Sequence, residues 1–178
     1  MQLLSFAVLS AFLCIPLAVN AQGSKANFSG QWALNAEKSN MGQPAQGQGQ
    51  PPQGGGMRMG GFGGGDFTAT QSANLLTVER TRTGQDGQAT TTTAKYTLDG
   101  KESVNTMGRG ESKSTATWSA DGKLLTIITT RTMERDGQST EMKTTEAWTL
   151  AGPSSLSIVS TMNTPNGEMK TTRVYDKK

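Results

Sequence analysis

Beyond residue 66, apolar side chains alternate with threonine, serine and charged residues through most of the chain. Successive side chains of a β-strand point to opposite faces, so a period of two is typical of strands with one buried and one wet face. The run 123–128 is apolar at both alternating sets of positions, and we expect it to be the most buried strand, covered on each side. No segment shows helical periodicity with capping residues, apart from a possible turn at 36–40.

Tight-turn dipeptides separate these alternating runs. They are Asp86-Gly87, Asp99-Gly100, Asp121-Gly122, Asp136-Gly137 and Asn166-Gly167. Asp-Gly and Asn-Gly accept the positive φ of two-residue hairpin turns and are a strong hairpin signal. Ten strands are predicted between such turns: 29–35, 66–71, 75–83, 88–98, 101–107, 112–119, 123–134, 138–150, 154–162 and 168–176.

Consecutive hairpins leave the two outer strands of a sheet with unpaired backbone groups unless the sheet closes. We therefore predict an all-β fold, a single antiparallel up-and-down barrel of about ten strands. A two-sheet sandwich or an open curled sheet is the alternative.

The first 21 residues are predicted to be a cleavable signal peptide. Residues 3–17 are almost wholly apolar, and Val19-Asn20-Ala21 offers the small residues of a cleavage site. We expect cleavage near Ala21 and a periplasmic or extracellular mature protein. Cys14 follows Leu13 rather than a small residue, which disfavours a lipoprotein signal.

One domain is predicted over residues 27–178, with a low-complexity insertion at 41–65. In that insertion Gly, Gln and Pro dominate and Arg58 is the only charge, so it buries too little apolar surface to offset its ordering entropy. We expect a disordered loop after the first strand, acting as a loose lid or as a spacer.

The charge pattern disfavours several classes of partner. The chain carries 17 Lys and Arg against 14 Asp and Glu, a net charge of +3, interspersed as on a solvated surface. Nucleic-acid binding is not predicted, because the sequence has no stripe of basic residues interleaved with aromatic ones. No apolar stretch after the signal is long enough for a membrane span. The sequence does not identify a protein partner.

The side chains most used in catalysis are missing. The chain has no histidine, and its one cysteine lies in the predicted signal, so we predict no enzyme, no metal site and no cofactor. Glu134, Glu141 and Glu146 are interpreted as solvated partners of nearby Lys and Arg. The pair Met57 and Met59 is too sparse to predict a copper site.

The two ends of the domain carry a family resemblance. The segment 28–34 contains Gly30-Gln31-Trp32, which resembles the Gly-x-Trp opening strand of the calycins, the group of lipocalins and fatty-acid-binding proteins. Arg173-Val174-Tyr175 resembles the last strand of fatty-acid-binding proteins. The phrase at 35–39 is similar to secreted bacterial lipocalin-like proteins of unassigned function. This resemblance implies a calycin-like barrel with Gly30 and Trp32 as its structural signature.

The resemblance also suggests a ligand site. Arg173 and Tyr175 lie two apart on one strand and therefore share a face; the family implies that they point inward and bind a ligand carboxylate. In the alternative, Arg173 covers the Trp32 ring as a cation–π contact. Arg131 and Lys143 are candidates for a second positive group, or are simply solvated.

The strands hold few Leu, Ile, Val and Phe but many Thr and Ser, which favours a polar or amphiphilic ligand. The predicted function is an exported non-catalytic binding module for a small amphiphilic or carboxylate-bearing ligand. The alternative is a structural or interaction protein of the cell envelope whose barrel is filled by its own side chains.

Overall fold

The computed structural model describes residues 24–40, 64–84, 87–107, 110–135, 138–164 and 167–178. The predicted signal and nearly all of the low-complexity insertion lie outside these residues. All regular structure in the described residues is β-strand, and none of these residues form a helix long and apolar enough to cross a membrane. The strands are β1 (Gly30–Asn40), β2 (Phe67–Ser72), β3 (Leu75–Thr83), β4 (Ala89–Thr97), β5 (Glu102–Met107), β6 (Gly110–Trp118), β7 (Leu124–Arg135), β8 (Gln138–Gly152), β9 (Ser155–Thr164) and β10 (Gly167–Lys177).

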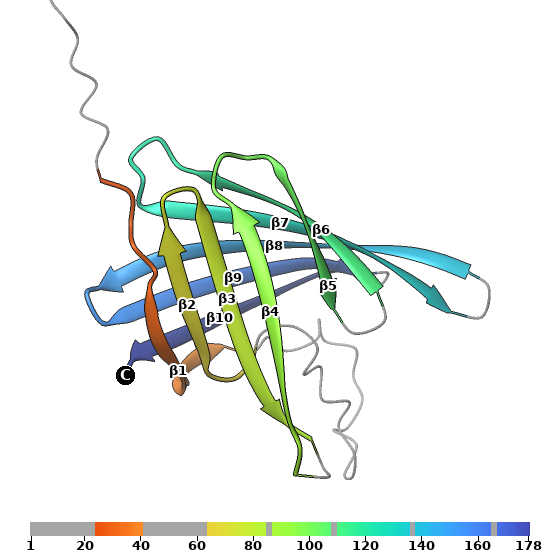
Figure 1. Cartoon of the computed structure of the whole chain (residues 1–178), viewed down its shortest axis with the longest axis horizontal. Coiled ribbons are helices and arrows are strands. Elements are labelled where there is room, and N and C mark those ends of the chain that lie inside the picture. Colours follow the sequence, from red (N-terminus) through yellow and green to blue (C-terminus); the bar gives the residue numbers. More distant parts are fainter. Residues whose placement is uncertain (1–23, 41–63, 85–86, 108–109, 136–137, 165–166) are drawn as a thin grey trace, which may run out of the picture.

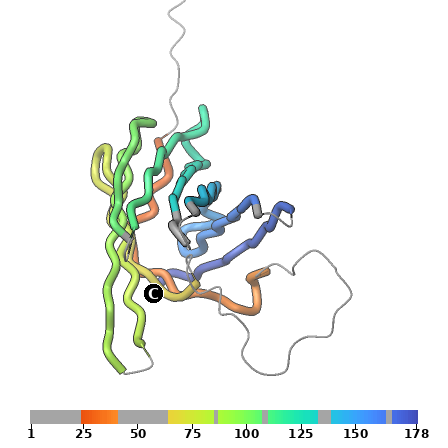
Figure 2. The backbone as a smooth tube through the Cα atoms, turned by 90° about the vertical axis from the view of Figure 1, so that its right-hand side faces the viewer, coloured from red at the N-terminus to blue at the C-terminus, as the bar shows by residue number. Residues whose placement is uncertain are grey.

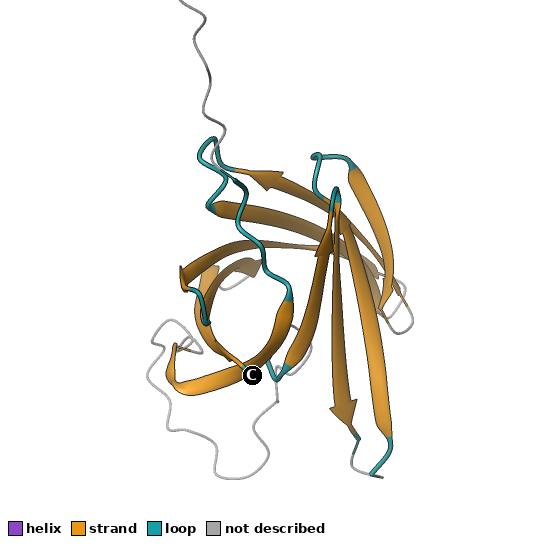
Figure 3. Cartoon of the chain, turned by 60° about the vertical axis from the view of Figure 1, so that its left-hand side comes forward, coloured by secondary structure: helices purple, strands orange, loops and turns teal. Residues whose placement is uncertain are grey.

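The strands form one antiparallel sheet in the order β4-β3-β2-β1-β10-β9-β8-β7-β6-β5. The first and last strands are hydrogen-bonded neighbours, with Leu34 opposite Tyr175. The sheet curls until β2–β4 cross in front of β7–β10 (Figure 1), and the same strands face one another as two layers in Figure 2. Seen from another side, the strands curve into a nearly complete ring (Figure 3). The predicted up-and-down barrel is confirmed.

Side chains of β5 bridge the seam between β4 and β5, the two ends of the sheet. The Asn105 side chain accepts a hydrogen bond from the Lys95 backbone N–H at 2.7 Å and donates one to the Lys95 carbonyl at 2.9 Å. Ser103 Oγ accepts from the Thr97 N–H at 2.9 Å. These side chains take the place of a neighbouring strand and satisfy backbone groups that an open edge would leave exposed.

β1 continues to Asn40, past the predicted strand end at residue 35, so the possible turn at 36–40 is wrong. Asn35 lies opposite Val174, but Asn40 lies opposite Thr172, because the register shifts between them. β1 thus holds extra residues that bulge out of the ladder while the strand continues along β10.

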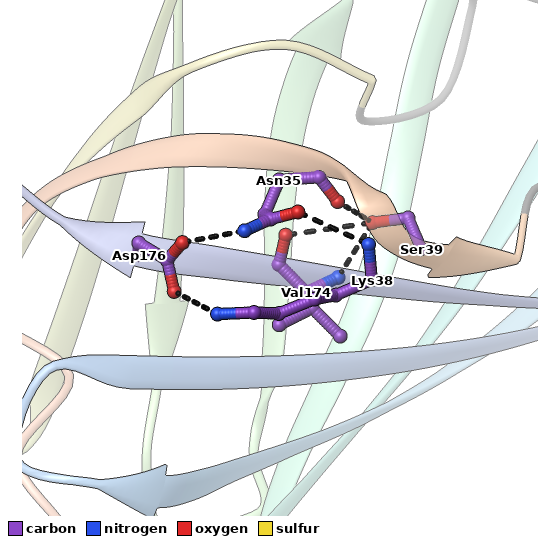
Figure 4. A network of polar contacts seen from close by, with 5 residues as sticks. All are labelled: Asn35, Lys38, Ser39, Val174 and Asp176. Carbon is purple, nitrogen blue, oxygen red and sulfur yellow. Dashed lines mark hydrogen bonds and ion pairs between the residues drawn. The ribbon is translucent and has the colours of Figure 1, made fainter.

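A polar network stabilises this bulge (Figure 4). Asn35 Oδ1 accepts from the Lys38 N–H at 3.0 Å, and Asn35 Nδ2 donates to Asp176 at 2.7 Å. Ser39 Oγ donates to the Asn35 carbonyl at 2.6 Å and accepts from the Val174 N–H at 2.9 Å. The Asn35 amide, assisted by Lys38, holds the pKa of Asp176 below its usual range. The phrase at 35–39 is therefore the sequence of the bulge.

An aromatic cluster fills one end of the barrel. Phe28 stacks on Trp118 and meets Trp148 edge-on, both at 5.7 Å between ring centroids. Phe67 meets Trp148 at 5.7 Å and Tyr175 at 4.9 Å. Trp118 and Trp148 therefore pack against Phe28 and Phe67 at this end of the barrel.

The segment 24–29 lies across this end. Ala26 N–H donates to the Gly122 carbonyl in the β6–β7 turn, and the Gln71 side chain of β2 bonds both Ala26 and Phe28. Trp32 Nε1 donates to the Phe28 carbonyl at 2.9 Å. Backbone and side-chain bonds thus tie the segment to opposite walls of the barrel and close that end.

The apolar run of β7 is buried on one face only. Leu125 and Ile127 are fully buried inside the barrel, whereas Leu124 and Ile128 on the outer face are half-buried. Because the barrel wall is a single sheet, nothing covers the outer face as a second layer would. The prediction of a strand covered on each side is therefore wrong.

Candidate ligand site inside the barrel

A polar layer lies inside the barrel next to the aromatic end. Period-two alternation puts these side chains on the same face as the apolar core of their strands. The buried polar residues of the described chain are Asn105, Ser112, Ser114, Thr144, Ser160 and Arg173. Burial of polar groups costs free energy unless they are hydrogen-bonded, so their partners decide what the site can do.

An ion pair between Arg173 and Glu146 is at the centre of this layer. Arg173 Nη2 lies 3.3 Å from Glu146 Oε1, and the two side chains are 5% and 17% exposed. Ser160 on β9, the strand between them, donates to Glu146 Oε1 at 3.3 Å and accepts a short hydrogen bond from Arg173 Nη2. Trp148 Nε1 donates to Glu146 Oε2 at 3.2 Å. Both carboxylate oxygens of Glu146 thus have partners inside the protein.

The interpretation of Glu146 as a solvated surface residue is wrong. Its spacing of two from Trp148 puts both side chains on the inner face of β8, where Arg173 compensates the buried charge. Glu141 lies five residues before Glu146 on the same strand, so it points to the opposite, outer face and is exposed as expected. The side chain of Glu134 lies outside the described residues.

Both tyrosines of the chain lie inside the barrel next to this layer. Burial raises the pKa of Tyr96 to about 12; the Glu146 carboxylate acts in the same direction and Arg80 opposes it. Burial also raises the pKa of Tyr175, against the opposing charges of Arg173 and Arg80. Both hydroxyls therefore stay protonated near neutral pH and can donate hydrogen bonds.

Arg80 is a second guanidinium on the inner face. It follows Leu76 and Val78 at a spacing of two on β3 and is half-buried. Its Cζ lies 5.0 Å from the centroid of the Phe67 ring. Its Nε is buried without a hydrogen-bond partner. The positive charge of Arg80 lowers the pKa of both Tyr96 and Tyr175, against the effect of burial.

The structure brings together two of the four predicted ligand residues. Arg173 and Tyr175 are buried on the inner face of β10. Arg131 shares the inner face of β7 with Leu125 and Ile127, further along the strand, where its guanidinium lies against Gly110. Lys143 is exposed on β8, on the face opposite to the buried Thr144.

The signature residues Gly30 and Trp32 have a structural role. The ammonium of Lys177 lies 5.6 Å from the Trp32 ring centroid, and its chain passes directly over Gly30. Lys177 therefore makes the cation contact with the Trp32 ring that the alternative assigned to Arg173. Arg173 instead pairs with the carboxylate of Glu146.

Three methionines continue the inner face beyond the polar layer. Met162 and Met169 lie directly opposite one another on β9 and β10, and Met142 is two positions from Thr144 on β8. All three are half-buried. Flexible, polarisable thioethers suit an adaptable apolar surface, so the interior offers a polar layer flanked by apolar groups.

The arrangement suits non-covalent binding. Among the described residues, no three His, Cys, Asp or Glu side chains gather as metal ligands would. The charged and hydroxyl groups of the polar layer can bind and orient a molecule through hydrogen bonds and ionic contacts.

Comparisons with known proteins bear on the fold. No protein-family model matches the chain, and no curated protein matches its sequence. Among solved structures, the chain is similar to zebrafish ileal bile acid-binding protein complexed with cholic acid. The TM-score is 0.52 at 16% sequence identity, over 85% of this chain and 98% of that chain. The chain has a calycin-like fold.

Sequence reasoning missed three residues of the calycin-like barrel's interior. Glu146, Arg80 and Tyr96 each lie two positions from a buried apolar residue of the same strand, and this spacing was the available signal. For the two charged residues, the same pattern also fits a solvated strand position, and only the curvature of the sheet turns their face inward.

Proposed function

We propose that the protein is an exported, non-catalytic binding module whose barrel holds one small amphiphilic ligand. The observation that carries this proposal is the polar layer centred on Arg173, Glu146 and Ser160. A barrel filled only for stability would bury apolar side chains there, because replacing a buried ion pair by apolar groups is often neutral or stabilising. A polar layer between aromatic and methionine groups matches a molecule with one polar and one apolar part.

The fold supports the same class of ligand. The similar zebrafish protein was solved in complex with cholic acid, a molecule with a carboxylate on an apolar frame. We infer an amphiphile of comparable character here, with its polar end at the layer holding Arg173 and Tyr175.

A non-catalytic role is supported by the interior chemistry. The chain has no histidine, and the buried Glu146 carboxylate is occupied by Arg173, Ser160 and Trp148. These partners of Glu146 hold its carboxylate in an ion pair inside the protein, which fits a structural role better than that of a general base positioned for a substrate proton.

Native mass spectrometry of protein purified gently from its own host tests the binding proposal. We expect a bound mass that unfolding and refolding the protein removes. Protein that is empty from the start would favour the alternative, a structural or interaction protein of the cell envelope. The fully buried rings of Phe28, Trp32 and Trp148 show that one end of the barrel already fills itself.

Export has its own test. The intact mass of the protein from its host should match a chain beginning at Gln22, recovered from the periplasm or the medium. An uncleaved mass in the cytoplasm would contradict export while leaving the binding proposal untouched.

A further inference from the structure

Two guanidinium groups of the barrel interior, those of Arg173 and Arg80, are in different electrostatic settings. Arg173 is paired with the carboxylate of Glu146 at 3.3 Å and also bonds Ser160. In the part of the chain that the structure describes, Arg80 makes no ion pair. The positive charge of Arg80 is therefore not neutralised by a carboxylate of the described protein.

The position of Arg80 suits a ligand contact. The Phe67 ring lies 5.0 Å from its Cζ, and such a cation–π contact holds a guanidinium in place without neutralising it. Tyr96 of the neighbouring strand β4 lies opposite Leu76, so its side chain is on the same inner face as Arg80 of β3. Arg80 lowers the pKa of both Tyr96 and Tyr175. A planar guanidinium with hydroxyl donors nearby matches the geometry of a carboxylate or sulfonate.

The charges of the layer predict the charge of the ligand. Arg173 and Glu146 cancel one another, so Arg80 leaves the group of three with one net positive charge. An anion bound at Arg173 would lie beside the buried carboxylate of Glu146, which already neutralises that guanidinium and would repel a second negative charge. An anion at Arg80 would not share the guanidinium with a carboxylate of the described residues.

We propose that Arg80, rather than Arg173, is the anion-binding group of the barrel, and that it binds the single carboxylate or sulfonate of an amphiphilic ligand with the hydroxyl of Tyr96. This inference rests on the proposed binding function. In this arrangement the Arg173–Glu146 pair is a neutral wall of the site, and Glu146 disfavours a ligand with a second negative charge near it.

Two fluorescent probes of nearly the same shape test the proposal. Anilinonaphthalene sulfonate carries one negative charge, and phenylnaphthylamine is its uncharged parent. Both are titrated by fluorescence into the full mature protein and into Arg80→Gln, Arg80→Lys and Arg173→Gln. Lys170→Gln, which removes an exposed positive charge on β10, is the matched control, and near-ultraviolet circular dichroism confirms the fold of each variant.

We expect Arg80→Gln to weaken binding of the sulfonate by about tenfold or more, since a hydrogen bond to a charged group is worth roughly 1.5–3 kcal/mol. Binding of the uncharged probe should change less than about twofold, and Arg80→Lys should retain part of the sulfonate affinity. Lys170→Gln should change neither probe.

Three outcomes would overturn the inference. Sulfonate binding that is unaffected by Arg80→Gln but lost in Arg173→Gln would assign the anion to Arg173 and leave the proposed function standing. Equal weakening of both probes in Arg80→Gln would show that Arg80 acts through packing and not through its charge. If the unaltered protein binds neither probe, the proposed function itself fails.

Discussion

Arg173 on β10 pairs with Glu146 on β8 at 3.3 Å inside the barrel, across the intervening strand that carries Ser160. The partners are 27 positions apart in the chain, and the strand order brings them together. Their pairing explains how one inner face tolerates two opposite charges with little access to water.

Loss of Glu146 should destabilise the protein strongly. Glu146→Gln leaves the buried guanidinium of Arg173 without its counter-charge, and we expect a loss of about 3 kcal/mol in the free energy of unfolding, measured by urea denaturation. The matched control is Glu141→Gln, an exposed position on the same strand, where a change within about 0.5 kcal/mol is expected. Equal effects of the two substitutions would contradict a structural ion pair.

Replacement of both partners tests the same pair independently. The double variant Arg173→Met, Glu146→Leu removes both charges together, so it should recover most of the stability that Glu146→Gln loses. A double variant at least as unstable as Glu146→Gln would show that packing at these positions, and not the unpaired charge, determines the stability.

The two tyrosines should lose their protons at a higher pH than a free tyrosine, so the free energy of unfolding should depend on pH in that range. Burial raises the pKa of Tyr96 from 10.0 to about 12, so the folded state favours the neutral hydroxyl. The resulting stabilisation, about 2–3 kcal/mol, is complete below pH 10 and is lost as the pH rises to about 12. Tyr96→Phe should show a shallower loss of stability across this window than the unaltered protein.

Tyrosinate absorbance measures this titration directly, because Tyr96 and Tyr175 are the chain's two tyrosines. Arg80→Gln should move the absorbance change to higher pH, since Arg80 lowers the pKa of both hydroxyls. A titration near pH 10 in the folded protein would show that the tyrosines are not buried as described.

The side-chain amide of Asn105 makes two of the hydrogen bonds across the seam between β4 and β5. Asn105→Ala removes both hydrogen bonds to the Lys95 backbone, and we expect a loss of about 1–2 kcal/mol. Amide exchange at Lys95 should accelerate more than exchange in β8. Thr106→Ala, exposed on the same strand, is the control; a similar change there would mean that Asn105 does not join the sheet ends.

The glycine of the Gly-x-Trp strand is predicted to be required by its backbone. Gly30 has a φ of 150°, and a Cβ there would lie 2.5 Å from Cε of Lys177. Gly30→Ala should lower the free energy of unfolding by about 1–3 kcal/mol. Gly152→Ala, where a Cβ meets nothing within 4 Å, should be nearly neutral.

Adding Lys177→Ala to the Gly30 variant separates the two causes. Recovery of stability would attribute the cost to contact with Lys177. If the cost persists, the backbone conformation of Gly30 causes it, which is the result we expect because the end of a lysine side chain can move aside.

The strands were predictable because their signals are local. Turn dipeptides such as Asp99-Gly100 and the alternation within each strand depend only on neighbouring residues, and nine of the ten predicted strands end within two residues of the observed bounds. The extension of β1 to Asn40 was not predictable in this way, since Ser39 bonds Val174 at a separation of 135 positions.

The interior charges were harder to predict than the strands. Arg173 and Tyr175 were found through a family resemblance, whereas Glu146 and Arg80 have no motif around them. A charged residue at an alternating strand position fits either face equally well. Its burial depends on a partner from a distant strand, which the sequence pattern does not identify.

The most direct test of the account is to observe the two tyrosine rings while a ligand binds. With ¹³C-labelled tyrosine, the spectrum should contain one set of ring signals for Tyr96 and one for Tyr175. Titration with anilinonaphthalene sulfonate should shift both sets to saturation, because the rings line the interior that we propose as the site. Saturable binding that leaves both tyrosines unchanged would place the ligand outside the barrel and contradict the account.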